Sequence, residues 1–397
     1  MNAIAVPSHV PFDRVLDFDM IADVAKGGLQ DAHRALHDKA PDVFFTPRNG
    51  GHWVATRMAD ITEIMTNPEV FSSADALPPM PWYMPKMKLP PQDMDPPQHM
   101  RYRLLLLKFL APREVKKLET RIRALMTELI DAALAKGSVD FVADVAVPFP
   151  VKIFMGMMGM DMSRFRQFVG WANAALASAK PRDRVMPFIR INLYMRSLIK
   201  QRKKHPGDDV VSMLIASEVE GKKLSDGMIL QICNLLFLAG LDTVTNGMTF
   251  ILRHLAEHPD QQQRLRDNSD EIPGAIEEML RRYAFVTVIR RVTRDTVLNG
   301  AALHAGDIIY GSLAGASNDE RVFPDPGTVD LDRPRPSHVA FNTGPHNCAG
   351  ANLARLELKV FLEEWLRRVP PFRLKPGQHL ETRGGAILAI EQLQVVW

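Results

Sequence analysis

A long apolar stretch in the second half of the chain constrains the fold more than any other feature. Ser225 can cap a helix that continues to about His258, where Pro259 stops it. Apolar side chains recur along this stretch at helical spacing, at Met228, Ile232, Leu235, Leu238 and Leu241. At about 30 residues the helix would span roughly 45 Å, which is long enough to cross a whole domain. We therefore expect one long central helix.

Helical spacing dominates the rest of the sequence, and strands are a minority. Between residues 101 and 218 apolar positions recur at helical spacing with breaks at glycine and proline, which predicts several antiparallel helices. Further helices are expected near 276–282 and over 351–368. Short segments with strand character are 44–45, 53–56, 286–293, 296–298, 308–310, 386–390 and 394–396. The Asn49-Gly50 turn dipeptide predicts a small hairpin between the first two. The expected fold class is mainly α with minor β.

The sequence carries no sign of a domain boundary. It contains no internal repeat, low-complexity linker or block of like charge. We expect a single domain over residues 1–397, with a helix-rich region and a small β-rich N-terminal subregion. Residues 77–97 differ from the rest, because eight prolines and four methionines exclude a continuous helix there. They predict an ordered, adaptable loop.

Composition excludes several classes of protein. Among 397 residues, 46% are hydrophobic and 24% are charged, which is typical of folded soluble proteins. The net charge of +3 is too small for a nucleic-acid partner. The two cysteines, Cys233 and Cys348, are 115 residues apart and allow no disulfide framework or Cys-pair zinc site. The first residues lack a secretory pattern, and the longest apolar run is far shorter than a membrane span. We expect a cytoplasmic protein that binds no membrane.

The segment from Phe341 to Gly350 is the most informative part of the sequence. It is a loop shaped by glycine and proline that delivers Cys348 directly before a helix. Backbone N–H groups and the positive end of the helix dipole favour the thiolate form of such a cysteine, and thiolate is the form that binds metal. Cys233, within an apolar helix, fits the alternative of a small buried hydrophobe.

This loop resembles the haem-binding loop of the cytochrome P450 family. Phe341, Gly344, Cys348 and Gly350 match every fixed position of the pattern Phe-x-x-Gly-x-x-x-Cys-x-Gly. The resemblance implies the P450 fold, in which haem b lies between a long distal helix and a proximal helix that follows the cysteine loop. It also implies that Cys348 is the axial ligand of the haem iron, whose electron donation favours O–O cleavage.

A second match lies in the middle of the long helix. Gly240 costs about 1 kcal/mol relative to alanine in a helix, and two polar residues, Asp242 and Thr243, follow it. The residues alone allow a hydroxyl that bonds back to the helix and bends it. The resemblance implies a catalytic acid–alcohol pair, in which Thr243 hydrogen-bonds the reduced oxygen species and Asp242 relays protons from solvent.

Two further segments resemble P450 motifs that contain charged residues. Glu278-x-x-Arg281 resembles the family's Glu-x-x-Arg, and with Arg333 it implies a structural ion-pair network rather than a catalytic one. The segment that begins at Asp95-Pro96-Pro97 resembles the bacterial family's start of a helix near the haem. Haem carries two propionates that need cationic or hydrogen-bonding partners when buried. The matching positions are His99, Arg103, Arg290 and His346. For Arg290 the alternative is the solvated face of a strand.

The resemblance covers essentially the whole chain and is nearest to the camphor-hydroxylase group. Camphor hydroxylases carry a tyrosine for the substrate ketone, and an ungapped alignment places Met87 there, so camphor itself is not expected. The substrate-contact positions carried over are apolar, namely Met87, Leu235, Leu238, Val286 and Ile387. They predict hydroxylation of a small terpenoid or norisoprenoid at an unactivated C–H bond, with O2 as co-substrate.

Electrons have to come from other proteins, because the chain has no nucleotide-binding glycine motif and no flavin module. The resemblance implies NAD(P)H as the source, with a ferredoxin reductase and a 2Fe–2S ferredoxin as partners. Arg103, Arg335 and Arg355 match positions near the proximal face, where an acidic ferredoxin would dock. These arginines could instead bind propionates or face solvent.

Three other functions remain open at this point. The enzyme could oxidise substituted aromatic acids, or the protein could be a haem-thiolate sensor without turnover, although a sensor would not need Asp242 and Thr243. A zinc hydrolase is suggested by His254 and His258, which are spaced for one helix face. That motif lacks the glutamate directly after the first histidine, which would act as the general base.

Overall fold

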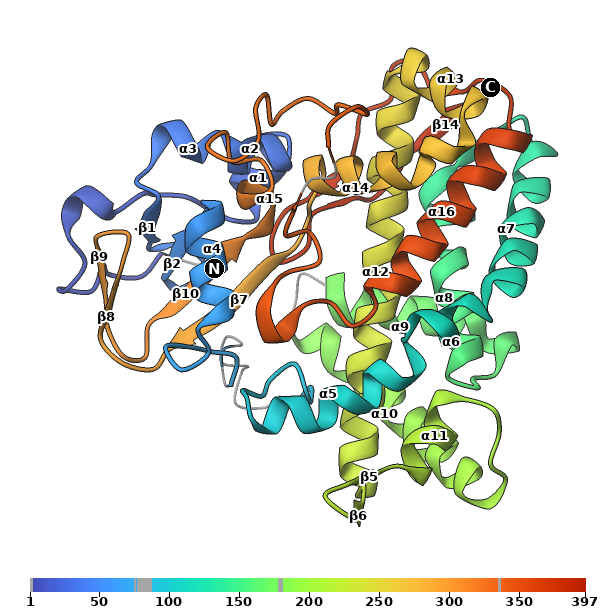
Figure 1. Ribbon diagram of the computed structural model, residues 1–397, viewed down its shortest axis with the longest axis horizontal. Helices are drawn as coiled ribbons and strands as arrows, with labels where there is room; N and C mark the ends of the chain where they lie inside the picture. Colours follow the sequence, from blue (N-terminus) through green and yellow to red (C-terminus); the bar gives the residue numbers. More distant parts are fainter. Residues whose placement is uncertain (1–2, 75, 77–87, 178–180, 335–336) are drawn as a thin grey trace.

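The computed structural model describes residues 3–74, 76, 88–177, 181–334 and 337–397. Helices form most of it, and the strands belong to several small sheets (Figure 1). The α-helices are α1 (Ala22–Lys26), α2 (Gln30–Arg34), α3 (Leu36–Lys39), α4 (Met58–Thr66), α5 (Gln98–Phe109), α6 (Pro112–Lys116), α7 (Glu119–Leu134), α8 (Pro148–Met157), α9 (Phe165–Ala177), α10 (Pro181–Lys204), α11 (Val210–Ala216), α12 (Asp226–Glu257), α13 (Pro259–Asp267), α14 (Ile272–Arg282), α15 (Leu313–Ala316) and α16 (Ala351–Arg368).

Short helical turns and short strands connect these helices. The turns are η1 (Phe12–Arg14), η2 (Arg48–Gly50), η3 (Val142–Ala146), η4 (Met162–Arg164), η5 (Ser269–Glu271) and η6 (Gly344–His346). The strands are β1 (Val43–Thr46), β2 (His52–Ala55), β3 (Phe71–Ser72), β4 (Ser138–Asp140), β5 (Glu218–Val219), β6 (Lys222–Lys223), β7 (Thr287–Val292), β8 (Thr296–Leu298), β9 (Ala301–Leu303), β10 (Ile308–Ser312), β11 (Arg373–Leu374), β12 (Thr382–Arg383), β13 (Ala389–Ile390) and β14 (Gln394–Val396). The predicted class, mainly α with minor β, is confirmed.

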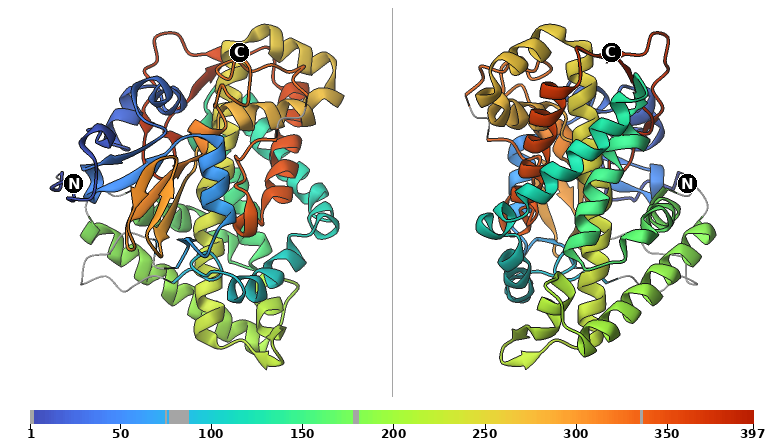
Figure 2. Two further views of the ribbon diagram at one scale, coloured as in Figure 1. Left: turned by 60° about the vertical axis from the view of Figure 1, so that its left-hand side comes forward. Right: turned by 90° about the vertical axis from the view of Figure 1, so that its right-hand side faces the viewer.

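The long helix predicted from the sequence is α12. The Ser225 hydroxyl accepts a hydrogen bond of 3.2 Å from the Met228 N–H and caps the helix, and Pro259 begins the next helix directly after it. Figure 2 shows α12 passing through the full height of the molecule. By length and composition α12 could also cross a membrane. It packs instead against α8, α10, α14 and α16 as an interior helix.

The largest sheet joins segments that lie far apart in the sequence. Its strand order is β1-β2-β10-β7-β3, and β10 pairs parallel to β2 and antiparallel to β7. The predicted hairpin at Asn49 is confirmed by the antiparallel pairing of β1 with β2. The φ angle of 54° at Asn49 is one that asparagine adopts more readily than most residues. The β-rich subregion expected at the N-terminus is therefore completed by strands from the last third of the chain (Figure 1).

Two expectations about local structure differ from the outcome. Several antiparallel helices separated by breaks were expected over 101–218, and no strand was expected there, but β4 follows the break at Gly137 and pairs with β14 near the C-terminus. The segment 386–390 was expected to be one strand, but only its last two residues form β13. Ile387 instead makes an isolated bridge with Val286. Both differences come from pairing with distant segments, which no local pattern encodes.

The main hydrophobic cluster joins the two ends of the chain. It contains buried side chains from Phe18 near the N-terminus to Val395 near the C-terminus, with Trp365 of α16 fully buried among them. A second cluster packs α8, α9, α10 and α11 around the first half of α12 and includes Cys233, as expected for a small buried hydrophobe. α12 also packs against α16, the helix that follows the cysteine loop.

Candidate functional site

The loop before α16 has a fixed shape that presents one cysteine. Gly344 has a φ of +68°, and a Cβ atom there would lie 2.4 Å from the Met65 carbonyl oxygen, so no other residue fits. The Cys348 N–H donates a hydrogen bond of 2.8 Å to the Phe341 carbonyl, which closes the loop. Gly350 then caps α16. The pattern that suggested this loop from sequence therefore corresponds to a rigid turn.

Cys348 has a mixed electrostatic environment. Its side chain is exposed to solvent, yet protein atoms crowd around its sulfur. The resulting desolvation raises the pKa of the thiol, whereas the Gly350 N–H and the guanidinium groups of Arg103 and Arg355 lower it. The expected N–H donor is thus present, but it does not by itself make the free thiol acidic. The Cys348 sulfur has no disulfide partner and can act as a metal ligand.

Asp242 and Thr243 lie on α12 beside a close contact that accounts for Gly240. A Cβ atom on Gly240 would come within 2.8 Å of the Phe154 ring, so the glycine allows α8 to approach. The Thr243 hydroxyl donates to the Ala239 carbonyl at 3.0 Å, which is the back-bond that the sequence left open. The carboxylate of Asp242 pairs with Arg383 of β12 at 3.2 Å. No sequence signal pointed to Arg383, which is 141 residues away from Asp242 in the chain.

The four residues predicted to bind propionates form one cluster. The rings of His99 and His346 lie 4.1 Å apart, and Arg290 and Arg103 both contribute positive charge at these rings. Desolvation lowers the pKa of His99 to about 4 and that of His346 to about 3. Burial also lowers the pKa of Arg290 to about 10, and with 8% exposure its side chain does not belong to a solvated strand face.

The buried polar groups of this cluster have few protein partners among the described residues. Both ring nitrogens of His99 are buried without a hydrogen-bond partner among the described residues. Arg290 donates to the carbonyl of its neighbour Ile289, and Asp95, the nearby carboxylate, already accepts hydrogen bonds from Ser72 and Ser73. Buried donors without partners are costly unless a ligand satisfies them. The residues present therefore fit the carboxylates of haem.

The predicted substrate positions are only partly brought together. Val286 and Ile387 pair through the isolated bridge, and Leu235 and Leu238 lie one turn apart on α12. Leu235 is 7% exposed and is packed into the second hydrophobic cluster. Met87 lies outside the described residues.

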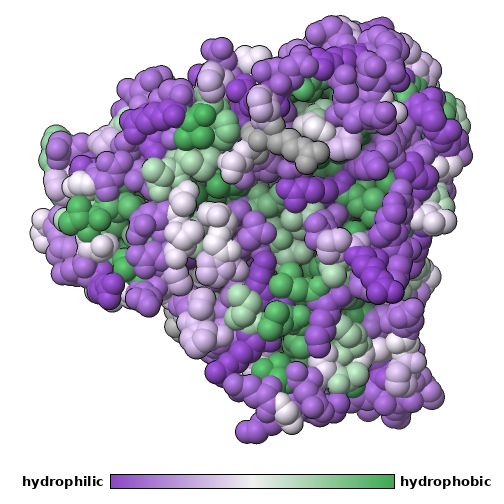
Figure 3. All heavy atoms as spheres, viewed as in Figure 1, coloured by the Kyte–Doolittle hydropathy of each residue, from purple (hydrophilic) through white to green (hydrophobic). Residues whose placement is uncertain are grey.

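The predicted proximal arginines differ in their contacts. Arg103 donates a hydrogen bond to the Asn347 carbonyl of the cysteine loop. Arg355 forms a bidentate ion pair with Glu277, at 2.7 and 2.8 Å, and lies 4.5 Å from the Phe341 ring. Arg335 lies outside the described residues. Figure 3 shows apolar side chains gathered in the middle of this face, with hydrophilic side chains around them.

Glu278, Arg281 and Arg333 form a buried network. Arg281 is fully buried and makes a bidentate pair with Glu278 at 2.7 and 2.8 Å, and Arg333 donates to the same carboxylate at 3.1 Å. The remaining Arg281 donors reach the carbonyls of Ser317, Pro326 and Thr328. Burial would raise the pKa of Glu278, but these cations keep it below its usual value.

The histidine pair that suggested zinc has other partners. The Tyr283 hydroxyl bonds Nδ1 of His254 at 2.8 Å, and Gln261 accepts from Nε2 at 2.9 Å. Both ring nitrogens are therefore used, and His254 has none left for a metal. The zinc-hydrolase alternative is not supported by this geometry.

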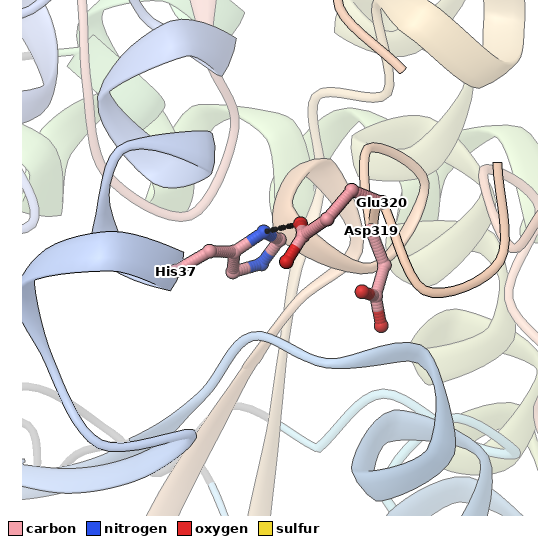
Figure 4. Close-up of side chains that lie close together, drawn as sticks. All are labelled: His37, Asp319 and Glu320. Carbon is pink, nitrogen blue, oxygen red and sulfur yellow. Dashed lines mark hydrogen bonds and ion pairs between the residues drawn. The ribbon is translucent and has the colours of Figure 1, made fainter. Parts of the chain in front are cut away.

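A second group of potential ligands, His37, Asp319 and Glu320, is an ion-pair cluster (Figure 4). Arg57 pairs with both carboxylates, at 2.8 and 2.7 Å, and supplies the positive charge that a metal would otherwise bring. His37 bonds Glu320 through one ring nitrogen and the Thr56 carbonyl through the other.

Comparison with known proteins identifies the class to which this fold and site belong. A family model described as Cytochrome P450 matches residues 165–384, which is more than half of the chain. The chain therefore belongs to the cytochrome P450 family of haem-binding monooxygenases.

Individual relatives cover almost the whole chain. A probable cytochrome P450 127A1 of Sinorhizobium fredii is 33% identical over 99% of this chain and 97% of the relative. A steroid C26-monooxygenase of Mycolicibacterium smegmatis is 36% identical over 90% of each. The crystal structure of CYP101J2 superimposes with a TM-score of 0.92 over 99% of both chains, at 32% identity. This likeness supports the predicted relation to the camphor-hydroxylase group.

The buried network makes a prediction about stability. Glu278→Ala leaves the Arg281 guanidinium buried without its carboxylate, which typically costs about 3–5 kcal/mol of unfolding free energy. Guanidinium unfolding of the haem-loaded protein measures this loss. Asp332→Ala is the matched control, because it breaks an exposed pair with Arg264 and should cost at most about 1 kcal/mol. Equal losses in the two variants would contradict the role of Glu278.

Proposed function

We propose that this P450 inserts one oxygen atom of O2 into an unactivated C–H bond of a small apolar substrate, a terpenoid or norisoprenoid. The observation that carries the haem assignment is His99, whose two buried ring nitrogens have no hydrogen-bond partner among the described residues. Its ring lies beside Arg290 and His346, near the loop that presents Cys348. The reaction consumes O2, two electrons and two protons, and yields the hydroxylated substrate and water.

The residues suggest a division of tasks. Cys348 would ligate the iron of haem b, His99, Arg103, Arg290 and His346 would hold its propionates, and Phe341 and Gly350 would shape the loop around the sulfur. When bound, haem supplies the chemistry that activates O2. The Thr243 hydroxyl on α12 would hold a proton by hydrogen bonding where O2 is reduced, and the Asp242 carboxylate would pass protons from solvent toward that hydroxyl. Glu278, Arg281 and Arg333 would act structurally.

The substrate class rests on apolar contacts. An apolar pocket selects by shape and by burial, at about 25 cal/mol per Å² of apolar surface. Val286, Ile387, Leu235 and Leu238 would provide such contacts, together with Met87. The name of the steroid C26-monooxygenase raises a second candidate, a larger alicyclic molecule such as a steroid. Substituted aromatic acids remain an alternative, which would require a cationic anchor in the pocket.

Electrons would come from NAD(P)H through a ferredoxin reductase and a 2Fe–2S ferredoxin. α5 and α16 lie on the face seen in Figure 1, and exposed Met100 and Leu104 accompany Arg103 on α5. Arg355, with 41% of its side chain exposed, adds positive charge near the cysteine loop. Apolar and cationic side chains together suit an acidic partner.

The remaining proposals concern the number of domains and the location of the protein in the cell. The cluster that joins Phe18 to Val395 supports a single domain over residues 1–397. The interior packing of α12 supports a cytoplasmic protein without a membrane span.

Substrate class is tested by titrating the purified ferric protein with monoterpenoids, norisoprenoids, steroids and substituted benzoates. We expect a terpenoid or norisoprenoid to shift the Soret band from the low-spin to the high-spin position, because an apolar ligand displaces water from the iron. A shift with steroids alone, or with benzoates alone, would replace the proposed substrate class with the corresponding alternative.

Ligation by Cys348 is tested by Cys348→Ser. We expect the variant to lose the red-shifted Soret band of the ferrous carbonyl complex, since that band depends on thiolate donation. Cys233→Ala, which changes the buried cysteine, should keep the band. Retention of the band in Cys348→Ser would remove the assignment.

The role of Thr243 is tested by Thr243→Ala. We expect NAD(P)H consumption to continue while oxygen leaves as hydrogen peroxide instead of product, because the hydroxyl that guides protonation is lost. Coupling is measured as product formed per NAD(P)H consumed. Thr249→Ala is the control, since Thr249 makes the same back-bond further along α12. Unchanged coupling in Thr243→Ala would contradict the role.

A further inference from the structure

Arg383 contacts the carboxylate of Asp242, the proposed proton relay, and no pattern in the sequence pointed to it. It lies in β12, and its Nη2 is 3.2 Å from Oδ2 of Asp242. Its Nε donates to the carboxylate of Glu391, so one guanidinium serves two carboxylates. Although burial lowers the pKa of Arg383, the hydrogen bonds and charges of Glu391 and Asp242 raise it overall.

The ion pair between Arg383 and Asp242 is partly buried. The side chains of Arg383 and Asp242 are 30% and 22% exposed, unlike the exposed surface pairs of the molecule. An ion pair at a partly buried site is screened less by solvent and salt than an exposed pair. Arg383 can therefore hold the orientation of Asp242 more firmly than an exposed pair would.

The hairpin that carries Arg383 is itself anchored. The Thr382 hydroxyl donates to the Ala25 carbonyl at 3.1 Å, and the Glu391 N–H donates to the Glu381 carbonyl at 2.8 Å. A Cβ atom on Gly384 would lie 2.4 Å from the Ile21 carbonyl oxygen, so the backbone packs closely against the N-terminal region. Arg383 thus projects from a fixed base toward α12.

Among the described residues, the other hydrogen bonds at Asp242 and Thr243 lie within α12. The Thr243 hydroxyl donates to the Ala239 carbonyl, and Asn246 donates to the backbone carbonyl of Asp242 at 2.8 Å. Among the interactions of the described residues, Arg383 is the partner of the Asp242 carboxylate. The orientation of that carboxylate is therefore decided by a residue outside the helix.

We propose that Arg383 is a positioning residue that orients the Asp242 carboxylate for proton delivery. The inference rests on the proposed role of Asp242. Because the guanidinium also pairs with Glu391, the position of Arg383 is itself fixed when it binds Asp242. The same hairpin carries Ile387, which bridges to Val286, and so links the proposed substrate contacts to the position of Asp242.

The test compares Arg383→Gln, Arg383→Lys, Asp242→Asn and the double variant Asp242→Asn with Arg383→Gln. Turnover is measured with a surrogate 2Fe–2S ferredoxin and its reductase, using the compound from the titration panel that gives the largest spin shift. The solvent isotope effect on kcat and the spectral Kd of that compound are measured alongside. Arg373→Gln is the control, because it removes an exposed arginine from β11.

We expect Arg383→Gln to lower kcat about tenfold and to raise the solvent isotope effect, because a misplaced relay group slows proton transfer. The spectral Kd should change less than about twofold, since Arg383 orients a proton relay and not the substrate. Arg383→Lys should restore most of kcat, and Arg373→Gln should behave as wild type. The double variant should match Asp242→Asn, because Arg383 acts only through Asp242.

Two results would overturn the inference, and they are distinguishable from a failure of the proposed function. Additive losses in the double variant, or no loss in Arg383→Gln while Asp242→Asn is impaired, would refute Arg383 alone. If Asp242→Asn leaves kcat and the isotope effect unchanged, the relay role of Asp242 fails and the role of Arg383 fails with it.

Discussion

A fully buried guanidinium cannot be left without partners, and the arrangement around Arg281 follows from that constraint. The Glu278 carboxylate and the carbonyls of Ser317, Pro326 and Thr328 converge on it. Glu278 belongs to α14 itself, whereas the three carbonyls come from two places between α14 and the cysteine loop, so this irregular stretch is tied to α14 through Arg281. The desolvation of one charge, which would be costly alone, thereby specifies the path of the segment that leads to Cys348.

The candidate site also contains buried polar groups, but protein atoms satisfy fewer of their hydrogen bonds. Around Arg281 the donors are satisfied by protein, whereas the buried side chains of His99 and Arg290 have fewer partners among the described residues than they can bind. Desolvation keeps His99 and His346 neutral by lowering their pKa to about 4 and about 3. Buried donors and a buried guanidinium are costly unless an anion pairs with them, and the two propionates of haem have the required negative charge. The site is built to be completed by its cofactor.

Helix α12 carries a closely packed position and a polar side chain within three residues, at Gly240 and Asp242. Gly240 lets Phe154 of α8 approach, while Asp242 turns toward a hairpin from the C-terminal part of the chain. That hairpin is anchored against the N-terminal region. The N-terminal region therefore supports the relay carboxylate indirectly, through that hairpin, and the main hydrophobic cluster likewise contains residues from both ends of the sequence.

Local patterns in the sequence were sufficient for features that depend on neighbouring residues. The spacing of apolar residues and the cap at Ser225 determined α12, and the glycines around Cys348 determined the shape of its loop, because helix capping and turn geometry act over a few residues. The ion pair of Asp242 with Arg383, the bridge of Val286 with Ile387 and the pairing of β4 with β14 were decided only by the tertiary structure. These contacts join residues more than 100 positions apart, and their energy depends on burial and on the approach of distant segments, which no local pattern records.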